Sequence, residues 1–405
     1  MKYILMVTLL ICISAQEVTK QSVDKAIAKG IKYLFAKQSS EGFWSKHNHD
    51  LYPMGQTSLV AYTLIKSGVS PEDSRIEKAF SYLEKLPLKK TYSVALYLMA
   101  TEAKYSALGK TKLSERKQQL LKKRKYHPFR LLANKKEQKN ILRAVKFLET
   151  STSTGTWGYP QGVGDLSNTQ YALLGLFSAE RLGLPVDKKI YYKVVRFFID
   201  AQEKDGPTIR RPFVVPAADQ PIDWQWRKKL EKQIAKLKKR NKTDSLNKLY
   251  PRSSVTVVTM RARGWKYRED HGKVTGSMTT AGVACMVIAK AYLEKWRSSR
   301  WKKLLPQINE SIRDGCAWIA HNFKVNRNPN GGHLYYYLYG LERAGILSGV
   351  EHFASHNWYI EGAKKMLKDQ KRNGKFKDNI IDTCFALLFL KRATVPVRIE
   401  TQADE

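Results

Sequence analysis

The chain has 405 residues, and its 72 lysines and arginines against 36 aspartates and glutamates give a formal net charge of +36. This length would usually predict two or three domains, and so large a positive charge indicates contacts with anionic surfaces. The sequence contains no nucleophile elbow, phosphate-cradling glycine loop or dinucleotide fingerprint, so the common hydrolase and nucleotide-binding classes have no motif to support them.

The first residues are typical of a secretory leader. Lys2 precedes an apolar run at residues 3–13, which is followed by Ser14 and Ala15. We predict a signal peptide over residues 1–15, cleaved after Ala15, because the apolar run is too short to span a bilayer. The protein is therefore expected to be exported, to the periplasm or the extracellular space. We expect no later segment to cross a membrane, because the other apolar stretches contain charged or polar residues.

The stretch at residues 29–44 predicts a helix that ends in a tight turn. Apolar residues fall on one face at helical spacing, and Gln38, Gly42 and Trp44 follow. Gly42 can adopt the positive φ that often ends a helix. Gln38 can bind unpaired backbone groups there, and Trp44 can cover the junction.

This pattern recurs along the chain, which is the mark of a repeat protein. Similar copies begin near residues 193 and 361, and looser ones near residues 78, 143 and 314. In the copy at residue 193 the tryptophan position is expected to be Thr208, and in the copy at residue 361 it is Phe376. A second apolar helix is predicted after each copy, at residues 57–66, 92–103, 168–182, 278–293, 333–344 and 382–392. Six helix pairs make the predicted fold all-α.

The repeat resembles the glutamine–tryptophan signature of the squalene-cyclase and prenyltransferase repeat superfamily, which the copy at residues 29–44 matches at every defined position. Residues 335–345 and 382–390 resemble a planctomycete-type bacterial branch of cyclase-like proteins. The resemblance implies an α/α toroid, with six outer and six inner helices around a central cavity. It gives one domain at residues 20–395, with basic insertions at about 108–135 and 207–275 and a polar tail at 396–405.

The positive charge is concentrated in these two insertions. Residues 122–125 form one basic cluster, and residues 227–242 contain two more, with apolar residues at the spacing of an amphipathic helix. A solvated charged surface is the plain interpretation. The alternative is binding to anionic lipid or to a cell-envelope polymer, since clustered lysines are attracted to anionic headgroups. Nucleic acid is not favoured as a partner, because we find no recognition module and the leader directs the chain out of the cytoplasm.

The candidate site residues lie where the predicted inner helices begin, because such helix ends form the cavity mouth in toroids and attract anions. The candidate ligand-binding residues are Asn168, Thr169, Thr383, Tyr335, Tyr336 and Tyr337. The same residue types also serve as helix caps and core residues. Cys285, Cys316 and Cys384 remain after the leader, and this odd number on apolar helix faces predicts buried thiols.

The resemblance also bears on catalysis. Triterpene cyclases protonate an alkene with an Asp-x-Asp-Asp motif, but this chain has Ile381 and Ser167 where the central aspartate would be. The candidate catalytic residues are therefore Asp382, His333 and Asp165, as a possible acid, a polarising group and an orienting group.

Protein prenyltransferases use zinc instead, bound by an Asp-x-Cys pair and a later histidine. His333 resembles that histidine, but the pair at residues 314–316 lies on an outer helix and the pair at residues 382–384 follows it in the wrong order. We predict no metal and no other cofactor.

Two functions remain open. The first is an exported protein that binds an apolar or isoprenoid ligand, or an envelope component. The alternative is an enzyme that uses the same cavity: a divergent cyclase, a prenyltransferase-like enzyme or a polysaccharide-active enzyme. An enzyme requires two of Asp165, Asp382, His333 and Glu342 within hydrogen-bond reach. A binding protein requires an aromatic and aliphatic lining.

Overall fold

The computed structural model describes residues 18–44, 52, 54–123, 127–152, 154–159, 163–209, 213–219, 259–270, 272–295, 298–377 and 379–396. The predicted leader, the basic run at residues 227–242 and the predicted tail after residue 396 lie outside these ranges. Within them the chain is all-α, as predicted, apart from one hairpin of two short strands, β1 (His352–Phe353) and β2 (His356–Asn357).

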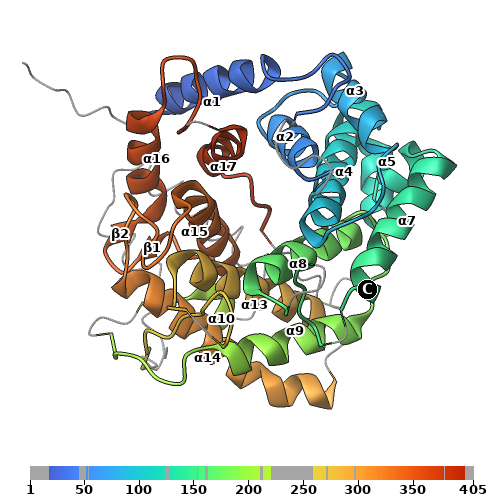
Figure 1. Ribbon diagram of the computed structural model, residues 1–405. Coiled ribbons are helices and arrows are strands. Elements are labelled where there is room, and N and C mark those ends of the chain that lie inside the picture. Colours follow the sequence, from blue (N-terminus) through green and yellow to red (C-terminus); the bar gives the residue numbers. More distant parts are fainter. Residues whose placement is uncertain are drawn as a thin grey trace, which may run out of the picture.

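Six helices, called the inner helices here, pack against one another in chain order. They are α2 (Gly55–Lys66), α4 (Thr91–Lys112), α8 (Leu166–Arg181), α13 (Gly276–Glu294), α15 (Leu334–Ser348) and α17 (Ile380–Lys391). Each contacts the next, and α17 contacts α2, so the series of contacts closes on itself (Figure 1). Most residues of these helices are buried, as expected for helices that are covered on every side.

A second set of six helices covers the inner ones. They are α1 (Lys20–Phe35), α3 (Ser74–Leu83), α7 (Lys135–Thr150), α9 (Lys188–Ala201), α14 (Ser299–His321) and α16 (Trp358–Asp369). Each buries one apolar face; in α9, for example, Ile190, Val194 and Phe198 recur every four residues and are buried. All twelve predicted helices are therefore present among the described residues, with shifted ends.

The second inner helix, predicted to end at residue 103, continues to Lys112, into the predicted first basic insertion. Tyr105 holds this extension by packing edge-to-face on Phe129, with ring centroids 5.0 Å apart. Two short helices follow, α5 (Glu115–Lys123) and α6 (Phe129–Leu132), and a third, α10 (Pro216–Asp219), lies in the second insertion.

The glutamine of the repeat connects neighbouring outer helices. The side-chain amides of Gln38, Gln202 and Gln370 each donate to two backbone carbonyls. The first acceptor is Gly42 or Gly374 in the turn of Gln38 or Gln370, and Arg263 for Gln202. The second acceptor lies in another outer helix. The second acceptors are the carbonyls of Arg75, Ser311 and Ala26, at 2.8, 3.1 and 2.8 Å. One side chain thus satisfies two backbone groups that the helix ends leave unpaired.

The tryptophan of the repeat connects an outer helix to the next inner helix. The indole nitrogens of Trp44, Trp157 and Trp265 donate to carbonyls near the C-terminal ends of α1, α7 and α9, at 2.7, 2.9 and 2.8 Å. Their backbone N–H groups donate to Thr57, Thr169 and Thr279, on the inner helices that follow. The expectation that Thr208 takes the tryptophan position is therefore wrong. Trp265 occupies it, because the second insertion separates this tryptophan from its glutamine.

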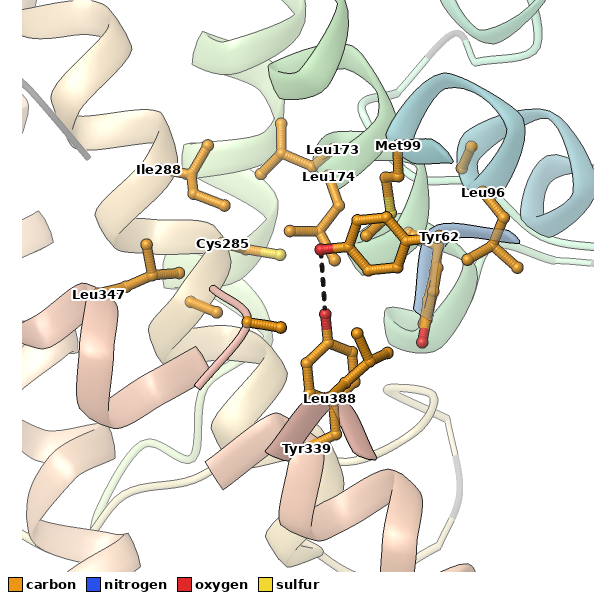
Figure 2. Close-up of a cluster of buried hydrophobic side chains, with 14 of the residues drawn as sticks. Tyr62, Leu96, Met99, Leu173, Leu174, Cys285, Ile288, Tyr339, Leu347 and Leu388 are labelled. Atoms are coloured by element: carbon orange, nitrogen blue, oxygen red, sulfur yellow. Dashed lines mark hydrogen bonds between the residues drawn. The ribbon is translucent and has the colours of Figure 1, made fainter. Parts of the chain in front are cut away.

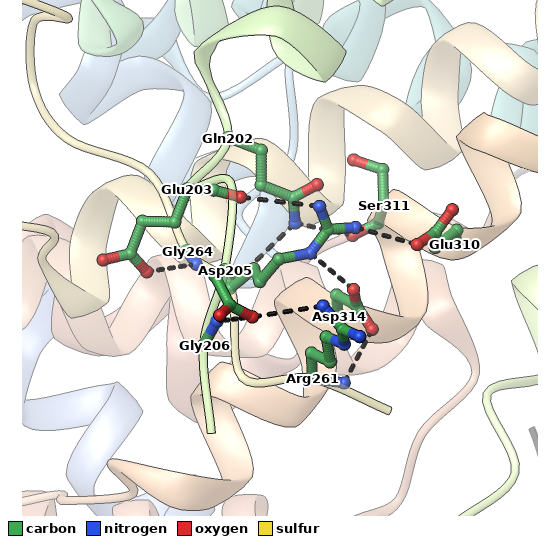
Figure 3. Close-up of polar contacts among 10 residues, drawn as sticks. Gln202, Glu203, Asp205, Gly206, Arg261, Gly264, Glu310, Ser311 and Asp314 are labelled. Atoms are coloured by element: carbon green, nitrogen blue, oxygen red, sulfur yellow. Dashed lines mark hydrogen bonds and ion pairs between the residues drawn. The ribbon is translucent and has the colours of Figure 1, made fainter. Parts of the chain in front are cut away.

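The two ends of the second insertion meet at the copy of the repeat that begins near residue 193 (Figure 3). Gln202 donates to the carbonyl of Arg263 at 3.0 Å, and the Arg263 side chain pairs with Asp314 on α14 at 2.6 Å. Asp314 also accepts from the backbone nitrogen of Arg261 at 3.0 Å. Burial raises the pKa of Asp314, and these two bonds oppose the shift. Asp314, a residue of the zinc alternative, here anchors a loop.

Among the described helices, α13 alone is long and apolar enough to cross a membrane. The sequence did not lead us to expect any such segment after the leader. The residues of α13 that meet this criterion are all buried inside the protein, against α8, α9, α14 and α15. Its composition is therefore that of a central core helix.

Candidate functional site

The faces that the inner helices turn toward one another define a candidate site. On α15, Tyr336, Tyr339, Arg343 and Leu347 follow at intervals of three or four residues and so share one face. Their chemistry changes from polar near the helix N-terminus to apolar further along. Residues 167, 170, 171 and 174 of α8 change in the same way. The interior thus has a polar layer, which begins at the N-terminal ends of the inner helices and extends to Arg343, and an apolar layer beside it.

The polar layer is a connected set that we call the tyrosine–arginine cluster. It contains Tyr62, Tyr92, Ser167, Gln170, Tyr171, Tyr336, Tyr339 and Arg343. The Ser167 hydroxyl contacts the hydroxyls of both Tyr92 and Tyr336, the latter at 2.5 Å. With the Gln170 amide assigned to satisfy both neighbours, its nitrogen donates to Tyr336 at 3.1 Å and its oxygen accepts from Nη2 of Arg343 at 2.9 Å.

Arg343 is the only charged side chain of this cluster, and it is 1% exposed. Its guanidinium carbon lies 4.1 Å from the ring centroid of Tyr339 and 5.8 Å from that of Tyr171. Burial lowers the pKa of Arg343, but the neighbouring tyrosines and Glu342 outweigh burial, so the pKa is raised and the group stays charged. Its Nη1 has no acceptor with hydrogen-bonding geometry among the described residues.

The apolar layer receives side chains from five of the six inner helices, α4, α8, α13, α15 and α17 (Figure 2). Its members are Leu96, Met99, Leu173, Leu174, Cys285, Ile288, Leu347 and Leu388. The hydroxyls of Tyr62 and Tyr339 meet at 3.4 Å between the two layers. Cys285, like Cys316 and Cys384, is a buried free thiol, as predicted. A lining of this kind suits an apolar molecule.

The opposite end of the interior carries a buried charge cluster. Arg181 donates to Glu102 through Nη2 at 2.8 Å, and Ser106 donates to the same oxygen at 2.8 Å. Burial raises the pKa of Glu102, but Arg181, Lys66 and Ser106 outweigh it and hold the pKa at about 2.

A histidine beside this cluster does not form a catalytic triad. Nδ1 of His127 accepts the backbone N–H of Phe129 at 3.1 Å, so Nε2 carries the proton and points at Ser106. This histidine is therefore a donor to the serine, and it cannot take the serine proton as a general base.

The chain after α17 is bound to α15, at the residue that precedes Arg343. It turns back beside α15 (Figure 1), where Thr394 donates to Glu342 through its backbone nitrogen at 3.0 Å and its hydroxyl at 2.5 Å. Glu342 is fully buried, and this burial raises its pKa to about 7 even though the Thr394 bonds and Arg343 oppose the shift. This carboxylate therefore holds the C-terminal segment in place.

Two of the candidate catalytic carboxylates take part in helix capping, Asp165 as the capping residue itself and Asp382 as the partner of one. Asp165 accepts from the backbone and side-chain nitrogens of Asn168 at 2.7 and 2.8 Å, at the start of α8. Burial raises the pKa of Asp165, and the Asn168 bonds oppose the shift. In α17 the capping residue is Asn379, which Asp382 binds through its backbone nitrogen at 2.6 Å and its carboxylate at 2.8 Å.

The other candidates fall in three places. The hydroxyls of Thr169 and Thr383 accept hydrogen bonds from the backbone N–H groups of Trp157 and Phe376, respectively. Tyr336 lies in the tyrosine–arginine cluster, whereas Tyr337 donates to a backbone carbonyl at 3.0 Å. Tyr335 lines a surface cavity of about 490 Å³ and donates to Asp369 at 3.1 Å. His333 is exposed, with a left-handed backbone at φ 57°, just before α15.

The hydrogen bonds of Asp165, Asp382 and Glu342 thus go to Asn168, Asn379 and Thr394, and no two of the carboxylate and histidine candidates are joined within the described chain. Across the same ranges, no three His, Cys, Asp or Glu side chains are grouped closely enough to hold a metal ion. The geometry required of an enzyme by the sequence argument is therefore not formed by these residues.

Arg343, Gln170, Tyr62 and Tyr92 were not predicted as site residues. Spacing alone could have identified Arg343, because it stands seven residues after Tyr336, on the same helix face. Gln170 stands one residue after Thr169, a predicted position, so the helix start was found but the inward-facing residue was not.

The fold and the site define an all-α protein of paired helices, whose inner helices enclose a buried tyrosine–arginine cluster beside an apolar layer. Compared with models of known protein families and with curated proteins, the chain matches none.

Proposed function

We propose that the protein binds an apolar ligand of the isoprenoid type between its inner helices, and that these helices form the toroid implied by the cyclase-like repeat. The observation that carries the proposal is the apolar layer, to which five of the six inner helices contribute. A soluble carrier needs such a lining, because burying the ligand's apolar surface is the main source of its affinity.

Binding without catalysis is the form of the proposal that the site supports best. The candidate acids Asp165, Asp382 and Glu342 are engaged by asparagines or by Thr394. A general acid that protonates an alkene has to face the substrate with its proton available. The remaining interior groups are tyrosines, a glutamine and an arginine, which orient a ligand more readily than they transform one.

The ligand would enter at the N-terminal ends of the inner helices. The Glu102–Arg181 ion pair lies nearer the other end, since Arg181 is the last residue of α8. The predicted export of the chain and the attraction of its basic insertions to anionic lipid or envelope polymer place such a carrier at the cell envelope. We include both in the proposal.

The test is a titration of the purified protein with farnesol, a soluble isoprenoid alcohol, followed by intrinsic tyrosine and tryptophan fluorescence. We expect saturable binding with one site per chain. Leu174→Trp should abolish it, because the larger ring would occupy the apolar layer. Leu142→Trp is the matched control on the outer helix α7, where the leucine is 48% exposed. Absence of saturable binding by the unmodified protein, or equal binding by both variants, would contradict the proposal.

A further inference from the structure

Arg343 differs from the other interior arginines described above in being fully buried and in having no carboxylate partner. Arg181 pairs with Glu102 at 2.8 Å and Arg263 pairs with Asp314 at 2.6 Å. No ion pair within the described chain involves Arg343. Its neighbour in sequence, Glu342, is bound to Thr394 instead. A buried cation without an anion is costly to a fold, so such a group is normally paired.

The neutral groups around Arg343 satisfy it only in part. Gln170 accepts from Nε and Nη2 at 3.3 and 2.9 Å, and two tyrosine faces lie within cation–π range. Nη1 has no acceptor with hydrogen-bonding geometry among the described residues, and the buried hydroxyl of Tyr171 has no partner with such geometry either. The two groups are neighbours, because burial raises the pKa of Tyr171 and the charge of Arg343 opposes this larger effect. Unpaired buried polar groups are rare in folded proteins and call for a physical explanation. Here a donor of the guanidinium and a neighbouring hydroxyl remain available to a ligand.

We propose that Arg343 binds the anionic group of the ligand, a phosphate or a carboxylate at the end of its apolar chain. The inference deepens the proposed function and rests on it. A guanidinium can bind either anion through two parallel hydrogen bonds, and at a buried position each bond is stronger than in solution. The Tyr171 hydroxyl supplies a further donor beside it.

The position of Arg343 fits a ligand that is anionic at one end. Leu347, of the apolar layer, lies one turn further along α15. Cys285 on α13 belongs to the same layer; burial raises the pKa of its thiol, and the charge of Arg343 opposes this larger effect. A headgroup at Arg343 therefore places the attached chain against Cys285, Ile288 and Leu347. The tyrosine hydroxyls of the polar layer remain on the side of the headgroup that faces the proposed entrance.

The experiment compares matched ligands that differ only in charge. The purified full chain is titrated with farnesyl phosphate and farnesol, and in a second arm with palmitate and hexadecanol. The variants are Arg343→Met, which keeps an apolar stem of similar length, and Glu342→Gln, which changes the adjacent residue and leaves the arginine intact. Far-UV circular dichroism and thermal unfolding report whether each variant is folded.

We expect the unmodified protein and Glu342→Gln to bind one of the anionic ligands at least ~10-fold more tightly than the matching alcohol, as a charge-assisted hydrogen bond allows. Arg343→Met should bind both members of that pair with the affinity of the alcohol. The arm that shows the difference identifies phosphate or carboxylate as the headgroup.

Three outcomes would overturn the inference. Equal affinity of the unmodified protein for anion and alcohol in both arms removes the charge recognition but leaves the proposed apolar binding in place. If a folded Arg343→Met variant binds the anionic ligand and the matching alcohol more weakly by the same factor, the arginine has a structural role and does not bind the headgroup. Binding of none of the four ligands contradicts the proposed function itself.

Discussion

The side-chain amide of Gln370 donates a 2.8 Å hydrogen bond to the backbone carbonyl of Ala26, 344 residues earlier in the chain. It joins the last outer helix, α16, to the first, α1. The equivalent bonds of Gln38 and Gln202 join outer helices that are closer in sequence. One residue type of the repeat therefore both links successive units and brings the two ends of the described chain together.

Replacing this glutamine should weaken the closure. Gln370→Ala leaves the carbonyls of Ala26 and Gly374 without their side-chain donor, and we expect the free energy of unfolding to fall by about 1–3 kcal/mol. Urea unfolding followed by circular dichroism measures it. The control is Gln118→Ala, because that amide bonds only to the nearby carbonyl of Leu113. If the two variants lose the same small amount, the closure at Gln370 does not contribute to stability.

The ion pair of Glu102 and Arg181 should be more sensitive. Arg181→Met leaves Glu102, which is 5% exposed, without its strongest partner. A buried charge that loses its partner typically costs about 3–5 kcal/mol, and the lower half of that range is expected because the arginine is itself partly exposed.

The matched control is Lys295→Met. Lys295 pairs with Glu180, and its side chain is 43% exposed. We expect this exposed pair to contribute no more than about 1 kcal/mol. Unfolding midpoints of the two variants give the comparison, and a larger loss for the lysine variant would refute this ranking.

Glu342 predicts a specific dependence of stability on pH. Burial raises its pKa to about 7 in the folded protein, against an ordinary value of 4.5. Between these two values the folded state binds more protons than the unfolded state, so stability falls as the pH rises. The protonated form stabilises the fold fully below pH 4.5, and this contribution is lost as the pH passes 7, at a total of roughly 3 kcal/mol.

The measurement is the free energy of unfolding from pH 4.5 to 7.5 for the unmodified protein and for Glu342→Gln, which cannot titrate. The difference between the two should change over this range, while Glu361→Gln, at a more exposed carboxylate, should follow the unmodified protein. Parallel curves for all three proteins would show that Glu342 has an ordinary pKa.

The indole bond of Trp265 tests the corrected position of the repeat tryptophan. Trp265→Phe removes the 2.8 Å bond to the carbonyl of Phe198 and part of a fully buried ring, so we expect a loss of about 2–4 kcal/mol. Thr208→Val is the control, since Thr208 does not hold the tryptophan position. A larger loss from Thr208→Val would restore the original assignment.

The helices were predictable because their information is local. Apolar residues at helical spacing locate each helix of a pair, and Gln38, Gly42 and Trp44 mark the turn between the first two. The tryptophan of the copy near residue 193 was predicted wrongly, because the second insertion interrupts the motif and a fixed offset then selects Thr208. Only the hydrogen bonds of Trp265 to Phe198 and Thr279 show that Trp265 takes the tryptophan position of this copy.

The candidate site was less predictable, because it is assembled from distant parts of the chain. Ser167 and Tyr336 meet across 169 residues, and no local pattern specifies that contact. Threonines and aspartates at helix starts were chosen for their chemistry. In the structure Asp165 caps the start of a helix, and Thr169 and Thr383 bind the backbone of the repeat turn. Arg343 was overlooked because an arginine in sequence suggests the surface.

The most direct test of the central claim is mass spectrometry of the organic extract from the protein purified after expression of the whole sequence in a bacterium; if the predicted leader is cleaved after Ala15, the purified chain is residues 16–405. The account predicts one apolar compound per chain in the unmodified protein, and none in Leu174→Trp. An extract of the unmodified protein that contains no apolar compound in stoichiometric amount would contradict it.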